Sequence, residues 1–258
     1  MLSPAGGITI RLNVYEFGDP AGLPVVCLHG LTGYGGRYRE LAATRLPHRR
    51  VIAPDLRGHG RSGFDPPWDL ETHVADLLET LDELGVGPAG WVGHSLGGRL
   101  VVEVAARAPE RVTRGVLLDP ALLIETGVAL ERVEMLRGDV SFASPDEAID
   151  TRLADPLLFS TPRAVLEAEA AEHIQLEEDG RYRWRWSPGM AIVAWSEMTT
   201  APPPWPDCPT LVVVGAGSWI AVDIPDAANI ETVTVPGGHS VLWDDFDATA
   251  DAIARFLG

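Results

Sequence analysis

Residues 90–98 read GWVGHSLGG, a serine with a glycine two positions away on each side. The run GWVGHS is typical of a buried strand, and LGGRLVVEVAARAPE (96–110) has a helical pattern that ends at Pro109. A strand–Gly-x-Ser-x-Gly–helix sequence holds its serine on a strained turn, where Gly93 and Gly97 avoid collisions with neighbouring backbone. The helix that follows directs its first amides toward the same point. We interpret Ser95 as a nucleophile, with a helix-capping turn serine as the alternative.

The rest of the chain repeats this strand-then-helix order. Apolar runs at 24–30, 51–55, 114–120 and 210–216, and a further strand within 229–239, alternate with helical stretches near 37–46, from Asp69 onward and over 243–257. Residues 8–18 suggest an opening antiparallel hairpin or bent strand. Continuous apolar strands separated by amphipathic helices predict an α/β fold with a mostly parallel sheet covered on both faces.

The strand-and-helix order breaks between residues 121 and 206. This stretch reads as helices and loops, contains Trp184, Trp186 and Trp195, and is closed by the proline-rich segment 201–209. We therefore expect a helical cap at 121–206, inserted into a core domain made of 1–120 and 207–258.

Two further turns have sequences suited to catalysis. His239 follows a strand in PGGH (236–239), so it should lie at the same sheet edge as Ser95 and could act as its base. The glycine-rich turn HGLTG (29–33) follows the first buried parallel strand, and there the backbone amide of Leu31 could stabilise an oxyanion together with that of Leu96.

With these motifs, the chain resembles the α/β-hydrolase superfamily over nearly its whole length outside the cap. The loop DLRGHGRS (55–62) resembles the loop after the family's fourth strand. The resemblance implies a sheet of about eight strands, a cap inserted after strand six and a Ser-His-acid triad. It specifies the reaction less closely, because the superfamily includes esterases, lipases, lactonases, thioesterases, carbon–carbon hydrolases and lyases.

The triad acid departs from the usual pattern of that superfamily. Members commonly carry it just after the glycine that ends the seventh strand, but here Gly215 is followed by AGSWI without a carboxylate. Some relatives place the acid after the sixth strand, 24 residues beyond the nucleophile, and Asp119 lies at that spacing from Ser95. We expect Asp119 to be the acid and keep Asp223 as the alternative. Asp119 could also be a plain strand terminator in its Asp-Pro pair.

Several residues are expected to contact the substrate: Gly30, Trp195 and Trp219. The apolar stretches LLF (157–159) and MAIVAW (190–195) contribute either to the core or to a pocket for an apolar acyl or aryl group.

Composition narrows the possible partners. The formal net charge is −17, so nucleic acid is an unsuitable partner, and no apolar run is long enough for a membrane span. All 20 basic residues are arginine, which suggests a bacterial genome rich in G and C. No signal peptide is visible, and two isolated cysteines fit a cytoplasmic protein. We expect no cofactor or metal, and a monomer or homodimer.

These observations together predict a hydrolase of carboxylic esters that acts on a small-molecule substrate. A lactonase, thioesterase or carbon–carbon hydrolase could use the same residues. The unusual acid position also leaves open a binding protein of this fold without turnover.

Overall fold

A computed structural model of the protein describes residues 10–155 and 161–258. In these residues one sheet has seven strands, in the order β1-β3-β2-β4-β5-β8-β9. Only β1 is antiparallel to its neighbour, which confirms the mostly parallel α/β sheet. The strands are β1 (Val14–Gly18), β2 (Pro24–Leu28), β3 (Arg50–Pro54), β4 (Ala89–His94), β5 (Val112–Leu118), β8 (Thr210–Gly215) and β9 (Ile230–Val235).

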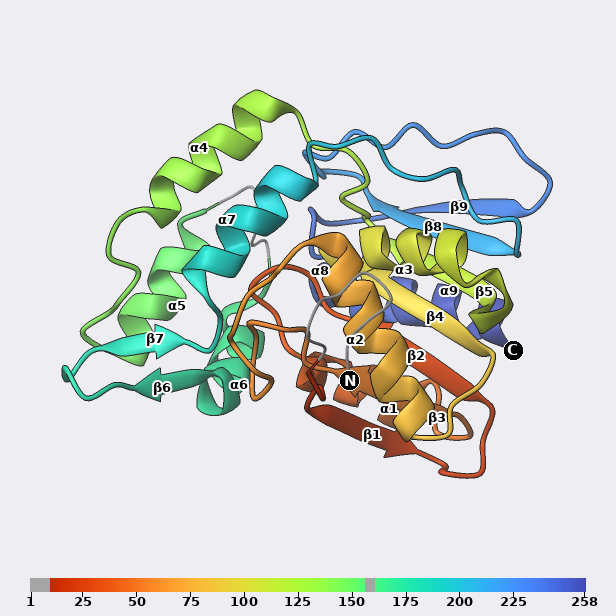
Figure 1. Cartoon of the computed structure of the whole chain (residues 1–258), viewed down its shortest axis with the longest axis horizontal. Coiled ribbons are helices and arrows are strands. Elements are labelled where there is room, and N and C mark those ends of the chain that lie inside the picture. The colour runs from red at the N-terminus through yellow and green to blue at the C-terminus, as the bar shows by residue number, and fades with distance from the viewer. Residues whose placement is uncertain (1–9, 156–160) are drawn as a thin grey trace.

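Helices cover both faces of this sheet (Figure 1). Successive side chains of a strand point to opposite faces, so Val26 and Leu28 of β2 join one buried cluster while Val25 and Cys27 join the other. The first cluster includes α2 (Leu70–Glu83) and α3 (Leu96–Arg107), and the second includes α1 (Arg39–Thr44), α8 (Val241–Asp244) and α9 (Phe246–Leu257). Two 3₁₀ turns, η1 (Gly35–Tyr38) and η2 (Pro109–Arg111), precede α1 and β5.

Between β5 and β8, which are neighbours in the sheet, the chain forms a separate group of elements at the left of Figure 1. Its elements are α4 (Thr126–Leu136), α5 (Pro145–Leu153), α6 (Arg163–His173), β6 (Ile174–Leu176), β7 (Tyr182–Trp184) and α7 (Pro188–Glu197). The antiparallel pair of β6 and β7 was not expected from the sequence. It is joined by a tight turn in which Gly180 has φ of +76°. The division into a core and a cap at 121–206 stays a prediction.

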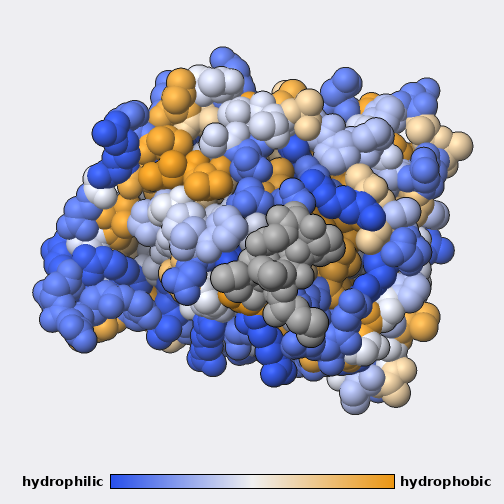
Figure 2. Space-filling view, viewed as in Figure 1, coloured by the Kyte–Doolittle hydropathy of each residue, from blue (hydrophilic) through white to orange (hydrophobic). Residues whose placement is uncertain are grey.

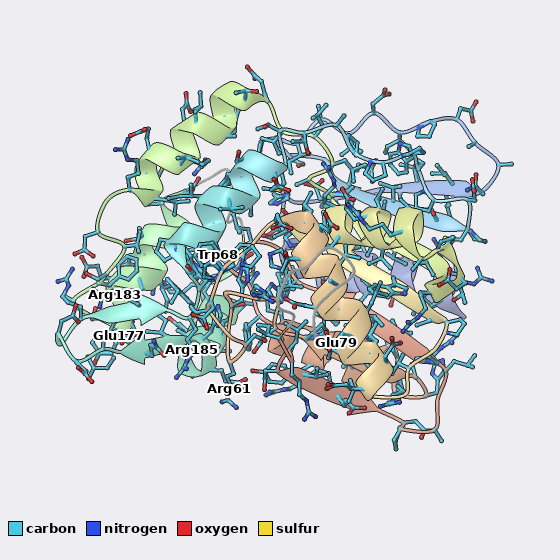
Figure 3. The ribbon with its side chains drawn as sticks, in the orientation of Figure 1. Arg61, Trp68, Glu79, Glu177, Arg183 and Arg185 are labelled. Carbon is cyan, nitrogen blue, oxygen red and sulfur yellow. The ribbon has the colours of Figure 1, made fainter. Side chains whose placement is uncertain are left out.

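Backbone hydrogen bonds join this group to the loop between β3 and α2. Gly60 N donates to Arg185 O at 2.7 Å, and Ser187 N donates to Gly58 O at 2.8 Å. Trp68 packs beside the start of α7, where a Cβ on Gly189 would lie 3.2 Å from its ring. Figure 3 labels Arg61, Arg185 and Trp68 along this contact.

Two expectations differ from the observed elements. Of the two alternatives for residues 8–18, a hairpin or a bent strand, the described residues form a single strand, β1, because the amides of Ile10, Leu12 and Asn13 donate to side chains of Asp76, Thr80 and Ser62 instead of to a partner strand. The sheet therefore has seven described strands instead of about eight. The single closing helix is divided into α8 and α9, because Asp245 leaves the helical conformation and its side chain caps the amide of Ala248.

None of the helices in residues 10–155 and 161–258 combines the length and apolar character that a bilayer-spanning segment needs.

A buried ion pair fixes the loop after β3 to α2. Asp76 accepts from Arg57 Nε at 2.6 Å and from Nη2 at 2.8 Å, and the two side chains are 0% and 1% exposed. Asp76 also accepts from the Ile10 amide. Removing one charge of such a pair leaves the other buried without compensation.

Asp76→Asn should therefore lower the free energy of unfolding by about 3–5 kcal/mol, measured by urea denaturation. Glu83→Gln, which breaks the solvent-exposed pair with Arg11, is the control and should change it by less than about 1 kcal/mol. Equal losses in the two variants would contradict this account of the loop.

Candidate active site

Four of the residues singled out in the sequence follow strands of the parallel part of the sheet. Leu31 follows β2, Ser95 follows β4, Asp119 follows β5 and His239 follows β9. The carboxyl ends of parallel strands meet at one edge, which is the usual place for a binding site in an open α/β sheet.

Ser95, His239 and Asp119 form a continuous chain of hydrogen bonds. His239 Nε2 lies 2.9 Å from Ser95 Oγ, and His239 Nδ1 lies 2.6 Å from Asp119 Oδ2. A carboxylate can only accept, so Nδ1 carries the proton and Nε2 accepts from the serine hydroxyl. All three side chains are buried. This arrangement allows His239 to take the proton of Ser95 while Asp119 stabilises the resulting imidazolium.

The turn at Ser95 is strained and sterically enclosed. Ser95 has φ of +53° and ψ of −116°, outside the regions that L-residues prefer. A Cβ on Gly93 would lie 2.3 Å from Gly97 O, and one on Gly97 would lie 2.3 Å from Leu28 O. The two glycines therefore allow the backbone to pass close enough to hold the serine in this conformation.

The candidate acid, Asp119, accepts hydrogen bonds from the loop after β8, in which Gly215 is followed by AGSWI without a carboxylate. Asp119 Oδ2 also accepts from Ser218 Oγ at 2.5 Å, and Oδ1 accepts from the Gly215 amide at 3.2 Å. The sequence reasoning missed Ser218, although its place in the loop that usually carries the acid was a usable signal. Asp223 is exposed, and among the described residues no hydrogen bond joins it to His239.

The turn after β2 lies against the serine. Gly33 N donates to Gly30 O at 3.0 Å, and Thr32 has φ of +65°. A Cβ on Gly30 would lie 3.0 Å from Ser95 Cβ and 2.8 Å from His94 Nδ1, so only glycine lets this backbone approach. The amides of Leu31 and Leu96 donate to no protein acceptor within the described chain, which leaves them available to a bound oxyanion.

His29 fixes the orientation of the Leu31 amide. Its Nε2 accepts from Leu56 N at 3.0 Å, and its Nδ1 lies 2.8 Å from Gly30 O. Burial lowers the pKa of His29 to about 3, so the ring is neutral and Nδ1–H donates to Gly30 O. Gly30 O and Leu31 N belong to one peptide plane, so this bond holds the amide in place.

His94, to which the sequence assigned no role, supports His239. Its Nε2 lies 2.9 Å from His239 O, and its ring centroid lies 4.8 Å from that of His239. Burial lowers the pKa of His94 well below its usual value. The neutral ring therefore donates to the carbonyl and packs against the imidazole.

A cavity of about 300 Å³ opens onto Ser95 and His239. Its walls include Leu31, Trp195 and Trp219, and the two tryptophan rings lie 6.3 Å apart. Gly30 and Leu96 lie outside the lining of this cavity. The apolar residues 157–159 lie outside the described residues. Figure 2 shows hydrophobic surface where α4 and α7 lie in Figure 1, and these helices supply Leu136 and Trp195 to the walls.

Within the described residues, no group of three or more histidine, cysteine or carboxylate side chains is arranged to hold a metal ion.

Comparison with known proteins gives one consistent family. Residues 24–246 match the family described as alpha/beta hydrolase fold. Lipase LipV of Mycobacterium tuberculosis is 36% identical over 189 residues, which is 73% of this chain and 72% of the lipase. Esterase YbfF of Escherichia coli is 27% identical over 247 residues, covering 91% of this chain and 92% of the esterase.

Solved structures agree with this result. The crystal structure of E-2-(acetamidomethylene)succinate hydrolase has a TM-score of 0.83 and 27% identity, covering 96% of this chain and 95% of the hydrolase. A marine microorganism esterase has a TM-score of 0.80 at 22% identity, covering 96% of this chain and all of the esterase, a likeness of fold alone. With its parallel sheet and the match over residues 24–246, this chain belongs to the α/β hydrolase family.

Proposed function

We propose that this protein is a serine hydrolase that cleaves carboxylic esters with an apolar acyl or aryl group. The observation that carries the proposal is the hydrogen-bonded chain from Asp119 through His239 to Ser95 at an apolar cavity. The names of the relatives, lipase and esterase, support the same class of reaction.

The proposed reaction has two steps. Ser95 Oγ attacks the ester carbonyl carbon while His239 Nε2 takes its proton, and the amides of Leu31 and Leu96 bind the oxyanion. When the tetrahedral intermediate collapses, the alcohol leaves with the proton from His239. Water then attacks the acyl-enzyme, with His239 as its base, and the carboxylic acid leaves as Ser95 regains its proton.

The site also explains the contribution of each supporting group. Asp119 fixes the proton on His239 Nδ1 and stabilises the imidazolium, while each oxyanion amide can lower the barrier by about 3 kcal/mol. Trp195 and Trp219 form apolar walls beside the serine, which suits a hydrophobic acyl or aryl group.

Ser95→Ala should reduce hydrolysis of p-nitrophenyl esters by at least about 10³-fold, because the hydroxyl is the attacking group. Ser196→Ala, at an exposed serine on α7, is the matched control and should keep full activity. A fluorophosphonate should label the wild type and the control but not Ser95→Ala. Full ester hydrolysis by Ser95→Ala would overturn the proposal, and higher activity on a parallel panel of lactones and thioesters would identify a different substrate class.

Asp119→Asn should lower kcat by about 10⁴-fold, because an amide cannot hold His239 in the required tautomer. The exposed residue Asp223 provides the comparison, and Asp223→Asn should leave kcat unchanged. The assignment of the acid is wrong if the two effects are reversed.

Gly30→Ala should lower kcat by about 100-fold, because the added Cβ must displace the oxyanion turn, His94 or Ser95. Gly87→Ala is the control, since a Cβ there would meet nothing within 4 Å. The assay is kcat on a p-nitrophenyl ester, with circular dichroism to verify folding. An active Gly30→Ala variant would show that this close approach is not needed for the reaction.

A further inference from the structure

Most of the cavity wall is apolar, but charged side chains also line it, and two of them, Arg37 and Arg152, lie beside Thr32. Both arginines bind one carboxylate. Arg37 donates to Glu169 through Nε and, at 2.7 Å, through Nη2, and Arg152 Nη1 donates to the same carboxylate at 3.1 Å. The exposed fractions of the three side chains are only 7%, 7% and 5%.

The side chains of Arg37, Arg152 and Glu169 together carry a net charge of +1. Two guanidinium groups face one carboxylate, and the remaining arginine of the cavity, Arg132, is paired with Asp155. Asp139 also lines the cavity, but it is exposed and accepts from Ser141. The stretches 1–9 and 156–160 contain no aspartate or glutamate, so they cannot supply the missing counter-charge.

Neutralisation of the neighbouring groups does not remove this excess charge. Burial lowers the pKa of Arg152 to about 9, an effect that Glu169 opposes and the charge of Arg37 increases. This value is still above neutral pH, so Arg152 stays protonated there. Burial and the two arginines also lower the pKa of His173, whose ring is therefore neutral. Arg37 Nη1 donates to no acceptor among the described residues, so it can donate to a ligand.

The cluster lies close to the proposed reaction centre. Arg152 Nη2 donates to Thr32 O at 3.0 Å, and Thr32 follows Leu31, whose amide is the proposed oxyanion donor. Since consecutive Cα atoms are about 3.8 Å apart, the guanidinium lies within roughly 10 Å of that amide. A short aliphatic chain spans this separation.

We propose that Arg37 and Arg152 form an anion subsite that selects esters whose acyl chain ends in a carboxylate. This inference rests on the proposed function, because it concerns the substrate of the same serine. The apolar walls hold the chain, and the terminal carboxylate supplies the second negative charge that the two arginines lack. Charge-assisted hydrogen bonds to a planar carboxylate are the interaction that arginine makes best.

The test compares two esters in one enzyme, the p-nitrophenyl half-ester of adipic acid and p-nitrophenyl hexanoate, after subtraction of their spontaneous hydrolysis. The wild type should show a kcat/KM at least about 10-fold higher for the adipate ester. In Arg37→Gln the remaining pair, Arg152 with Glu169, is neutral, and this ratio should fall by roughly 10- to 100-fold. Arg37→Lys, which keeps the charge without the planar fork, should retain part of the preference.

Arg39→Gln is the matched control. Arg39 also joins the core to α6, through Glu172, but this pair is exposed and outside the cavity, so the ratio should not change. The readout is the ratio of the kcat/KM values for the two esters. Partial loss of folded protein lowers both values equally, so it does not change the ratio. Equal kcat/KM values in the wild type, or a preference that survives Arg37→Gln, would overturn the subsite and leave the cluster as a structural tie. Failure to hydrolyse either ester would instead count against the proposed function.

Discussion

The turn at Ser95 is the constraint on which the rest of the site depends. A φ of +53° is unfavourable for a residue with a side chain, and it persists only where the surroundings enforce it. Here β4 ends and α3 begins within one residue of Ser95, and the glycines at 93 and 97 allow backbone contacts that any Cβ would prevent. Once this turn is formed, the serine hydroxyl, the first amide of α3 and the end of β5 all face the same space.

The proposed acid, Asp119, illustrates how one sheet edge could support the same chemistry from different strands. Asp119 follows β5, while the loop after β8, where relatives often carry the acid, donates its Ser218 hydroxyl and Gly215 amide to Asp119. These two strands are hydrogen-bonded neighbours, so a carboxylate from either one can reach His239. The residues directly after Gly215 thus include no carboxylate, but the two hydrogen bonds from the loop after β8 stabilise the negative charge of Asp119.

Local patterns predicted most of the fold, because buried strands and capped helices are encoded by nearby residues. The strand–turn–helix around Ser95 and the strand before His239 could be predicted in this way. Ser218, His94 and the Arg37–Glu169 pair were not, because their roles depend on contacts between residues more than 90 positions apart. The β6–β7 pair was missed for a different reason, since three-residue strands are too short for alternation to be recognised.

The core and the inserted group contribute different properties to the cavity. Ser95, Asp119 and His239 come from strand ends of the sheet, whereas Arg152, Glu169 and Trp195 come from α5, α6 and α7. Changes in those helices can therefore alter what the cavity binds without moving the hydrogen-bonded chain beside it. A surplus cation is unexpected in a chain of net charge −17, and burying it is costly unless a negative partner arrives. The carboxylate of the proposed substrate would supply that negative partner inside the cavity.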